Sequence, residues 1–156
     1  SDDPELSASV EQIQLELERL RFETSLSGGT VPLRECLRNA LRISTRAGFQ
    51  LEIEGLQPAL LATQLAPELA LRIERVLVTL TLNSIQAGAA TGWLGFEAVE
   101  ASFRVSFFDD GACYDPIDAL ASGGALSNLE RQLAAGGGSL GWTEEQNRTV
   151  TVALIA

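Results

Sequence analysis

Residues 124–140 read GALSNLERQLAAGGGSL, and this stretch contains the clearest local signals in the chain. It predicts a helix over about residues 126–135 that ends at three consecutive glycines, because glycine is a poor helix former and is favoured just after a helix C-terminus. A strand is then expected at residues 140–143. This strand and residues 149–155 are predicted to form a hairpin around residues 144–148.

Helices and strands are also predicted on the N-terminal side of this stretch. Pro32 and Gly48 bracket a predicted helix, since proline is favoured at the start of a helix and glycine just past its end. Residues 49–53 alternate apolar with polar side chains, as a half-buried strand does. Pro67 is placed to begin another helix. Further elements are predicted at residues 69–87 (helix), 93–99 (strand) and 103–108 (strand). Paired strands with helices between them predict an α/β (α+β) two-layer sandwich, in which one mixed sheet carries the helices on a single face.

Residues 5–26 are predicted to form a separate amphipathic helix. Its apolar residues recur at three- and four-residue steps: Leu6, Val10, Ile13, Leu17 and Leu20. This narrow seam needs a covering surface. Two arrangements provide one and both stay open: a homodimer through residues 5–26, or a helix folded back on its own domain. Because Ser27-Gly28-Gly29 breaks the helix, the chain divides into a linker and amphipathic helix (residues 1–28) and one domain (residues 29–156).

The composition excludes several classes of function. Hydrophobic residues make up 46% of the 156, enough for a packed core, and the net charge of −10 disfavours nucleic-acid binding. No apolar run reaches the roughly 20 residues of a membrane helix, and we expect a cytoplasmic protein. The chain contains no histidine, which excludes Ser-His and Cys-His catalysis and a histidine-ligated metal. Cys36 and Cys113 lie far apart without metal spacing and are expected to be reduced thiols.

Three polar features interrupt the predicted core elements. Asn83 is a polar residue near the end of an apolar helix, and its amide oxygen could be a ligand for Mg²⁺. The alternative is an Asn that is exposed to solvent or hydrogen-bonded near the helix end. Asp109-Asp110-Gly111 ends an apolar strand, where a carboxylate can accept a hydrogen bond from an exocyclic amine or merely form a turn. Gly123-Gly124 opens a helix, where backbone amides can bind phosphate, although a plain loop is equally consistent with two glycines.

In their order along the chain, these features resemble the nucleotide-binding domain of the GHKL group, and within it the sensor histidine kinases that pair with LuxR-type response regulators. The resemblance covers roughly residues 31–156. The stretch quoted first is similar to the family's glycine-leucine helix start, arginine-bearing helix and Gly-Gly-x-Leu turn. Thr149 falls on the family's Gly-Thr before the last strand. Residues 115–122 stand where the family has a short ATP lid, and residues 5–26 where it has the second dimerisation helix.

The resemblance implies bound ATP or ADP with Mg²⁺. The implied nucleotide-binding residues are Asn83, Asp109, Gly111, Gly123, Ala125, Leu126 and Thr149. Among them Asn83 matches the metal-binding Asn of the N-box, and Asp109 matches the Asp that reads adenine. Thr149 matches the Thr that supports adenine recognition.

Several family positions are altered. Thr79 stands where the family has a catalytic Glu four residues before the Asn, and a hydroxyl cannot act as a carboxylate base, so no catalytic residue is assigned. Gln86 and Ala87 replace a basic pair. The family's glycines are replaced at three further positions: Cys113, Ala125 and Arg148. Together these changes predict a weakened site.

The resemblance therefore implies a two-component signalling domain with degenerate catalytic motifs, weak nucleotide binding and negligible phosphotransfer. The helix that bears the family's phosphoacceptor histidine is missing from this sequence. The alternative is a non-catalytic pseudokinase, or docking module, that binds a response regulator or a kinase partner without nucleotide. An anti-sigma-factor kinase of the same group fits less well, because such kinases use the same Glu and lack the leading helix.

Overall fold

The computed structural model describes residues 29–100, 102–111, 124–146 and 148–156. The predicted helix at residues 5–26, the lid at residues 115–122, Cys113 and Gly123 lie outside the described residues. None of the helices in the described part of the chain combines the length and the hydropathy that crossing a membrane requires.

Five strands form the main sheet. In spatial order they are β2 (Gln50–Glu54), β4 (Thr91–Val99), β5 (Ser102–Asp109), β7 (Arg148–Ile155) and β6 (Ser139–Glu145). β2 and β4 run parallel, and every other neighbouring pair is antiparallel. The mixed sheet predicted from the sequence is therefore confirmed. The predicted C-terminal hairpin is also present, with Glu145 paired to Arg148 across its turn.

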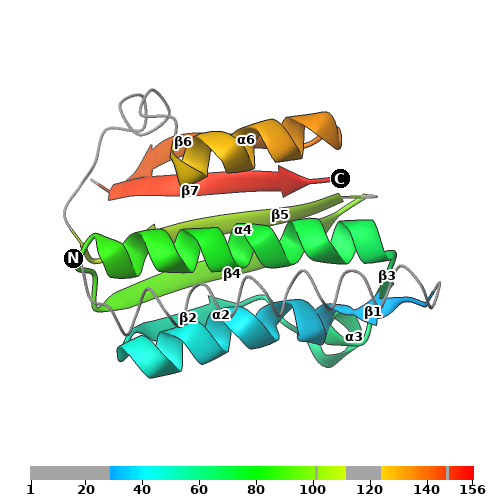
Figure 1. Cartoon of the computed structure of the whole chain (residues 1–156), viewed down its shortest axis with the longest axis horizontal. Coiled ribbons are helices and arrows are strands. Elements are labelled where there is room, and N and C mark those ends of the chain that lie inside the picture. Colours follow the sequence, from blue (N-terminus) through cyan, green and yellow to red (C-terminus); the bar gives the residue numbers. More distant parts are fainter. Residues whose placement is uncertain (1–28, 101, 112–123, 147) are drawn as a thin grey trace.

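Three helices lie side by side over the sheet (Figure 1): α2 (Leu33–Ala47), α4 (Pro67–Gln86) and α6 (Ala125–Ala135). Their ends follow the expected signals. Pro67 occupies the first turn of α4, and Gly48 ends α2 with a φ of 69°, a left-handed conformation that glycine adopts without steric cost. Gly88 follows α4 with a φ of 85°. These helix boundaries agree with the sequence-based prediction to within two residues.

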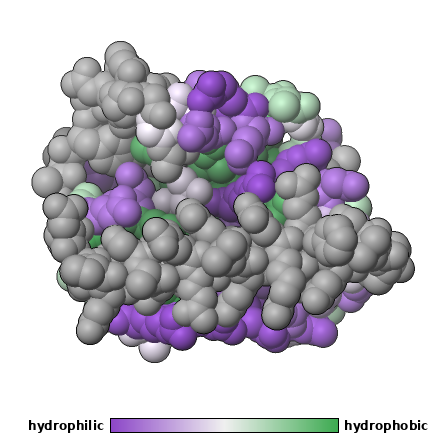
Figure 2. Space-filling view, viewed as in Figure 1, coloured by the Kyte–Doolittle hydropathy of each residue, from purple (hydrophilic) through white to green (hydrophobic). Residues whose placement is uncertain are grey.

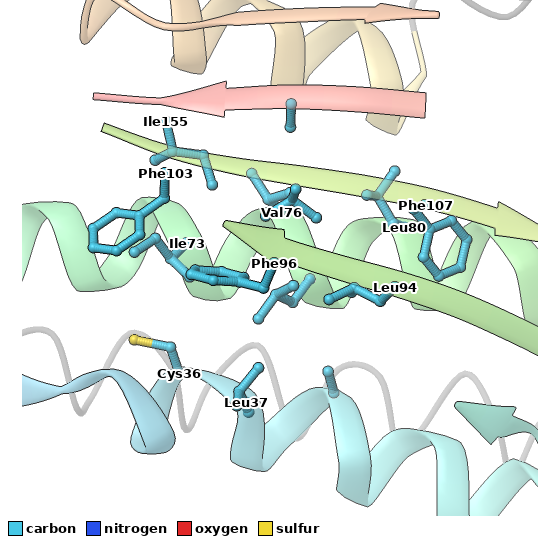
Figure 3. Close-up of a cluster of buried hydrophobic side chains, with 14 of the residues drawn as sticks. Cys36, Leu37, Ile73, Val76, Leu80, Leu94, Phe96, Phe103, Phe107 and Ile155 are labelled. Carbon is cyan, nitrogen blue, oxygen red and sulfur yellow. The ribbon is translucent and has the colours of Figure 1, made fainter. Parts of the chain in front are cut away.

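The core lies between the helices and one face of the sheet (Figure 3). Alternate residues of β5 point into it, with Phe103, Val105 and Phe107 all buried. The central helix α4 contributes Ile73, Val76, Leu77 and Leu80. The core side chains labelled in Figure 3 come from α2, α4 and three neighbouring strands: Cys36, Leu37, Ile73, Val76, Leu80, Leu94, Phe96, Phe103, Phe107 and Ile155. Since the described helices pack on one face of the sheet, the strands alternate as predicted.

The glycine turn after α6 is required by close backbone packing. Gly137 has a φ of 88°. A Cβ at Gly138 would lie 2.1 Å from the carbonyl oxygen of Leu154, a separation that no side chain tolerates. The Gly138 amide also donates a hydrogen bond of 2.8 Å to the Leu133 carbonyl, which terminates α6. This turn therefore sets how closely α6 returns onto β7.

Three short elements were not predicted from the sequence. They are β1 (Val31–Pro32), α3 (Pro58–Leu61) and β3 (Gln64–Leu65). β1 and β3 pair with each other, with Val31 opposite Leu65, in a small separate sheet. Two-residue strands carry no periodicity, so only the tertiary pairing defines them.

Candidate nucleotide site

A small polar cavity lies where the C-terminal part of α4 meets the end of β5 and the start of β7. Its lining residues are Leu80, Asn83, Ser84, Phe107, Phe108, Asp109, Thr149 and Thr151. Three of the sequence-predicted site residues, Asn83, Asp109 and Thr149, are thus brought together from three different elements. Asn83 and Thr149 are 66 positions apart in the sequence, so only the fold places them around one space.

Asp109 is the most firmly positioned group of the cavity. One carboxylate oxygen, Oδ2, accepts a hydrogen bond of 2.5 Å from the buried Ser84 hydroxyl, and Oδ1 accepts one of 2.9 Å from the backbone amide of Gly111. Each oxygen of an ionised carboxylate has a second lone pair. The carboxylate is therefore oriented by two donors and still able to accept a hydrogen bond from a ligand amine.

The two residues after Asp109 have structural roles. The Asp110 Oδ1 accepts hydrogen bonds from the Ala90 and Thr91 amides at 2.8 and 3.0 Å, and these bonds lower the pKa of the exposed Asp110 carboxyl. A Cβ on Gly111 would lie 3.2 Å from the Asp109 Oδ1, so glycine allows the carboxylate to sit against its own turn. Of the two carboxylates, only Asp109 lines the cavity.

Asn83 differs from Asp109 because no partner holds it. Its side chain is half-buried, and within the described part of the chain its amide forms no hydrogen bond. A polar side chain near the end of an apolar helix normally finds a partner there or points into water. Here Asn83 lines a cavity that is also lined by Asp109 and Thr149.

The remaining predicted residues are placed differently. Gly124 precedes α6 in an extended conformation, and Ala125 is the first residue of the helix, where its side chain is not described. The Leu126 side chain is buried in the hydrophobic core and does not line the cavity. Thr79 is half-buried one turn before Asn83, but it also does not line the cavity.

Arg148, which replaces a family glycine, packs against the outer face of the sheet. Its guanidinium carbon lies 4.5 Å from the centre of the Phe108 ring, and Phe108 stacks on Trp93 with ring centres 5.0 Å apart. The Arg148 backbone is not left-handed, whereas Gln146, two residues earlier, has a φ of 52°. The arginine therefore causes no backbone strain, and the cation–π contact stabilises it.

The cavity is small as it stands, about 20 Å³. That volume accommodates about one water molecule by the same measure. A Mg²⁺ ion fits only in part: among the described residues no group of three or more Cys, Asp or Glu side chains could hold a metal. Asn83 would supply one oxygen ligand, and the phosphates of a nucleotide and water would have to supply the others.

Sequence reasoning missed Ser84 and Thr151 as members of the cavity. Ser84 follows Asn83 directly and is 1% exposed. Thr151 lies two residues after Thr149 on β7, on the same face of the strand, and is 3% exposed. The signal for Ser84 was available, because Asn83 and Ser84 are consecutive polar residues in the mainly apolar C-terminal half of α4, which indicates a polar environment. Thr151 gave no such signal, since threonine is common in strands.

The five-stranded mixed sheet, the three helices on one face and the polar cavity at the end of α4 define a class: this is the fold of the ATP-binding domain of histidine kinases. Among solved structures, the chain is similar to the histidine kinase domain of the blue-light-activated histidine kinase of Erythrobacter litoralis. The two share 18% identity with a TM-score of 0.70, over 94% of this chain and 74% of that one. In the larger structure of that kinase, the chain covers 51% of the length.

Two further solved structures have the same fold. The histidine kinase AdeS of Acinetobacter baumannii matches with 15% identity and a TM-score of 0.62, over 100% of this chain and 85% of AdeS. The catalytic domain of histidine kinase ThkA matches with 17% identity and a TM-score of 0.59, over 81% of this chain and 94% of that domain. No protein-family model matches the sequence, and no curated protein matches it significantly. The likeness is therefore one of fold.

Proposed function

We propose that this chain is the ATP-binding part of a cytoplasmic two-component signalling protein, with weak nucleotide binding and negligible phosphotransfer. The observation that carries the proposal is the convergence of Asp109, Asn83 and Thr149 around one cavity of a histidine-kinase fold. Asp109 is oriented by two donors, as a group that reads a purine amine must be, and no described residue bonds the Asn83 amide.

The weakness follows from what surrounds these residues. Thr79 offers no carboxylate to activate an attacking group, and exposed Gln86 and Ala87 offer no positive charge to phosphates. The net charge of −10 opposes the approach of a nucleotide polyanion. Mg²⁺ bound to the phosphates and to Asn83 would offset part of that repulsion. A ligand can therefore be held by its base while its γ-phosphate meets few catalytic groups.

Calorimetric titration with Mg·ADP and Mg·ATP tests this proposal. We expect saturable binding that is weaker than micromolar, no turnover of ATP, and loss of binding in Asp109→Asn, which replaces one acceptor oxygen with a donor. Asp110→Asn is the matched control, because its carboxylate lies outside the cavity. Micromolar affinity with turnover would disprove the degenerate site, and unchanged affinity in Asp109→Asn would disprove its role.

A second candidate function is a docking module that binds a response regulator or a kinase partner without nucleotide. The small volume of the cavity, about 20 Å³, favours it, because a purine needs far more space unless the surrounding residues move. Thermal melting with and without millimolar Mg·ADP separates the two candidates. A ligand at a hundred times its dissociation constant adds about 2.7 kcal/mol to the free energy of unfolding, so an unchanged melting temperature supports docking.

The domain division and the assembly remain part of the proposal. Residues 29–156 would form the nucleotide-binding domain, and residues 1–28 would supply an amphipathic helix for a homodimer or for the domain itself. Light scattering of the whole chain and of residues 29–156 alone distinguishes the two. A dimer that becomes a monomer on truncation supports the dimer helix, and a monomer in both cases supports the folded-back helix.

A further inference from the structure

A second and larger cavity lies at the other end of α4, between its first turns and the last turn of α6. Its volume is about 280 Å³, near the lower end of the range for small-molecule sites. Arg72 and Arg75 line it together with Leu71, Gln132 and Ala135, and Pro67 and Glu68 complete its edge. We call it the arginine cavity. It shares no lining residue with the nucleotide cavity.

Arg72 is held in a fixed position at this cavity. Its side chain is half-buried, and one terminal nitrogen donates a hydrogen bond of 2.8 Å to the backbone carbonyl of Ala156. A Cβ on Gly136 would lie 3.0 Å from the Arg72 guanidinium carbon, so the glycine leaves space for the group. Since a guanidinium has five N–H donors and this bond uses one, further donors remain for a ligand.

Arg75 is half-buried as well, but no described residue forms a hydrogen bond or an ion pair with its side chain. A partly desolvated cation without a counter-charge is unfavourable, because the lost hydration is not replaced. Arg72 and Arg75 are three residues apart on α4, which places their Cβ atoms about 5–6 Å apart on one face of the helix. Two positive charges therefore lie next to each other beside an open space.

This concentration of positive charge is local. The chain carries 21 acidic and 11 basic residues, so its overall field repels anions. Among the residues that line the cavity, Glu68 is the acidic one; it is exposed and belongs to the first turn of α4. Hydrophilic side chains gather over α6 on the face seen in Figure 2. An anion that binds here must gain its affinity from the two guanidinium groups at short range.

We propose that the arginine cavity binds the phosphate or carboxylate dianion of a small molecule. The planar guanidinium groups match oxyanions in a bidentate manner, the Gln132 amide can add a further donor, and Leu71 and Ala135 can contact an apolar part of the ligand. Eight residues separate Arg75 from Asn83, about 12 Å along the α4 axis. The site is therefore distinct from the proposed nucleotide site and does not depend on it.

Titration of the chain with inorganic phosphate and with succinate, at constant ionic strength kept with sodium chloride, tests the proposal. The readout is the ¹H–¹⁵N resonances of the arginine Nε–H groups, which are simple to assign because the chain has 11 arginines and no lysine. We expect the Arg72 and Arg75 resonances to shift with saturation at millimolar concentration for at least one of the two anions. The responses to phosphate and to succinate identify which kind of dianion the site prefers.

Variants distinguish a built site from general screening. Arg75→Gln should weaken binding at least tenfold, and Arg75→Lys should weaken it less because the charge remains. Arg46→Gln removes the same charge from the exposed end of α2 and should leave binding unchanged. Asp109→Asn should also leave it unchanged, which excludes binding at the nucleotide cavity. Shifts that grow without saturation for both anions, or equal binding by Arg75→Gln and Arg46→Gln, would overturn the proposal.

Discussion

Glu74 offers the sharpest test of the packing between α2 and α4. Its side chain is 5% exposed on α4, and its Oε1 accepts a hydrogen bond of 2.7 Å from the Asn39 amide on α2. Burial, with a smaller effect from the Glu35 carboxylate, raises the pKa of Glu74 to about 7, although the Asn39 bond acts in the opposite direction. The folded protein therefore holds a proton on Glu74 at a pH where the unfolded chain has released it.

The size and the sign of the effect follow from this pKa. The ordinary pKa is 4.5, and at about 1.4 kcal/mol for each step of one in pKa the rise to about 7 corresponds to about 3.5 kcal/mol. The favourable contribution is fully present below pH 4.5 and is lost as the pH rises through about 7. Stability should fall by up to about 1.4 kcal/mol per pH unit between pH 5 and 7.

We expect Glu74 to dominate the pH dependence of stability between pH 5 and 8. The chain has no histidine, burial raises the pKa of the nearby Cys36 thiol to about 12, and the pKa of Asp110 is lowered. Urea unfolding at pH 5, 6, 7 and 8 therefore reports mainly on Glu74. Glu74→Gln keeps an acceptor for Asn39 and should be more stable than the parent protein at pH 8, with little pH dependence.

The matched control is Glu54→Gln, which removes a carboxylate from an exposed position on β2 and should keep the parent slope. A free energy of unfolding that is flat between pH 5 and 8 would refute the reasoning. So would a Glu74→Gln variant that keeps the slope of the parent, because the titrating group would then lie elsewhere.

Three further variants test the cavity and the turn. Ser84→Ala removes one of the two donors to Asp109 and should weaken Mg·ADP binding by about three- to tenfold in calorimetry. Unchanged affinity would show that the Gly111 amide alone orients the carboxylate. Gly138→Ala should destabilise the fold by about 2–3 kcal/mol in urea unfolding, because its Cβ would meet the Leu154 carbonyl, and a loss below 0.5 kcal/mol would contradict that. Asn83→Ala should keep or slightly raise the melting temperature, since alanine favours a helix. The same variant should lower the affinity for Mg·ADP more than the affinity for metal-free ADP. Equal losses of the two affinities would exclude Asn83 as a metal ligand.

Most of the fold could be predicted from the sequence because its long elements have strong local signals. Pro67 and Gly88 bracket α4, and the apolar residues Phe103, Val105 and Phe107 alternate through β5. The pairing of β1 with β3 could not be predicted, because Val31 and Leu65 lie far apart in the sequence and two-residue strands have no periodicity. Glu74 was also missed, since an acidic residue on a long helix normally faces water and only the contact with α2 buries it.

The candidate site was predictable as a set of residues but not as a geometry. Asn83, Asp109 and Thr149 were identified by the resemblance in order along the chain, and the fold brings them to one cavity. Leu126 was assigned to the site as well; its side chain packs in the core, and its contact with a nucleotide stays a prediction. The volume of the cavity depends on how side chains from three elements pack together. No local sequence pattern predicts that volume.

Asn83 is more informative about ligand binding than Asp109. The Asp109 carboxylate accepts bonds from Ser84 and Gly111, so the fold itself gives a reason for an aspartate there, whether or not a nucleotide binds. Asn83 has no such reason: it lowers helix propensity, and within the described residues nothing bonds its amide. An amide that no described residue bonds, in a cavity lined by an oriented carboxylate, is what the proposed ligand site requires. Whether Asn83→Ala costs affinity without costing stability therefore decides between a nucleotide-binding domain and a docking module of the same fold.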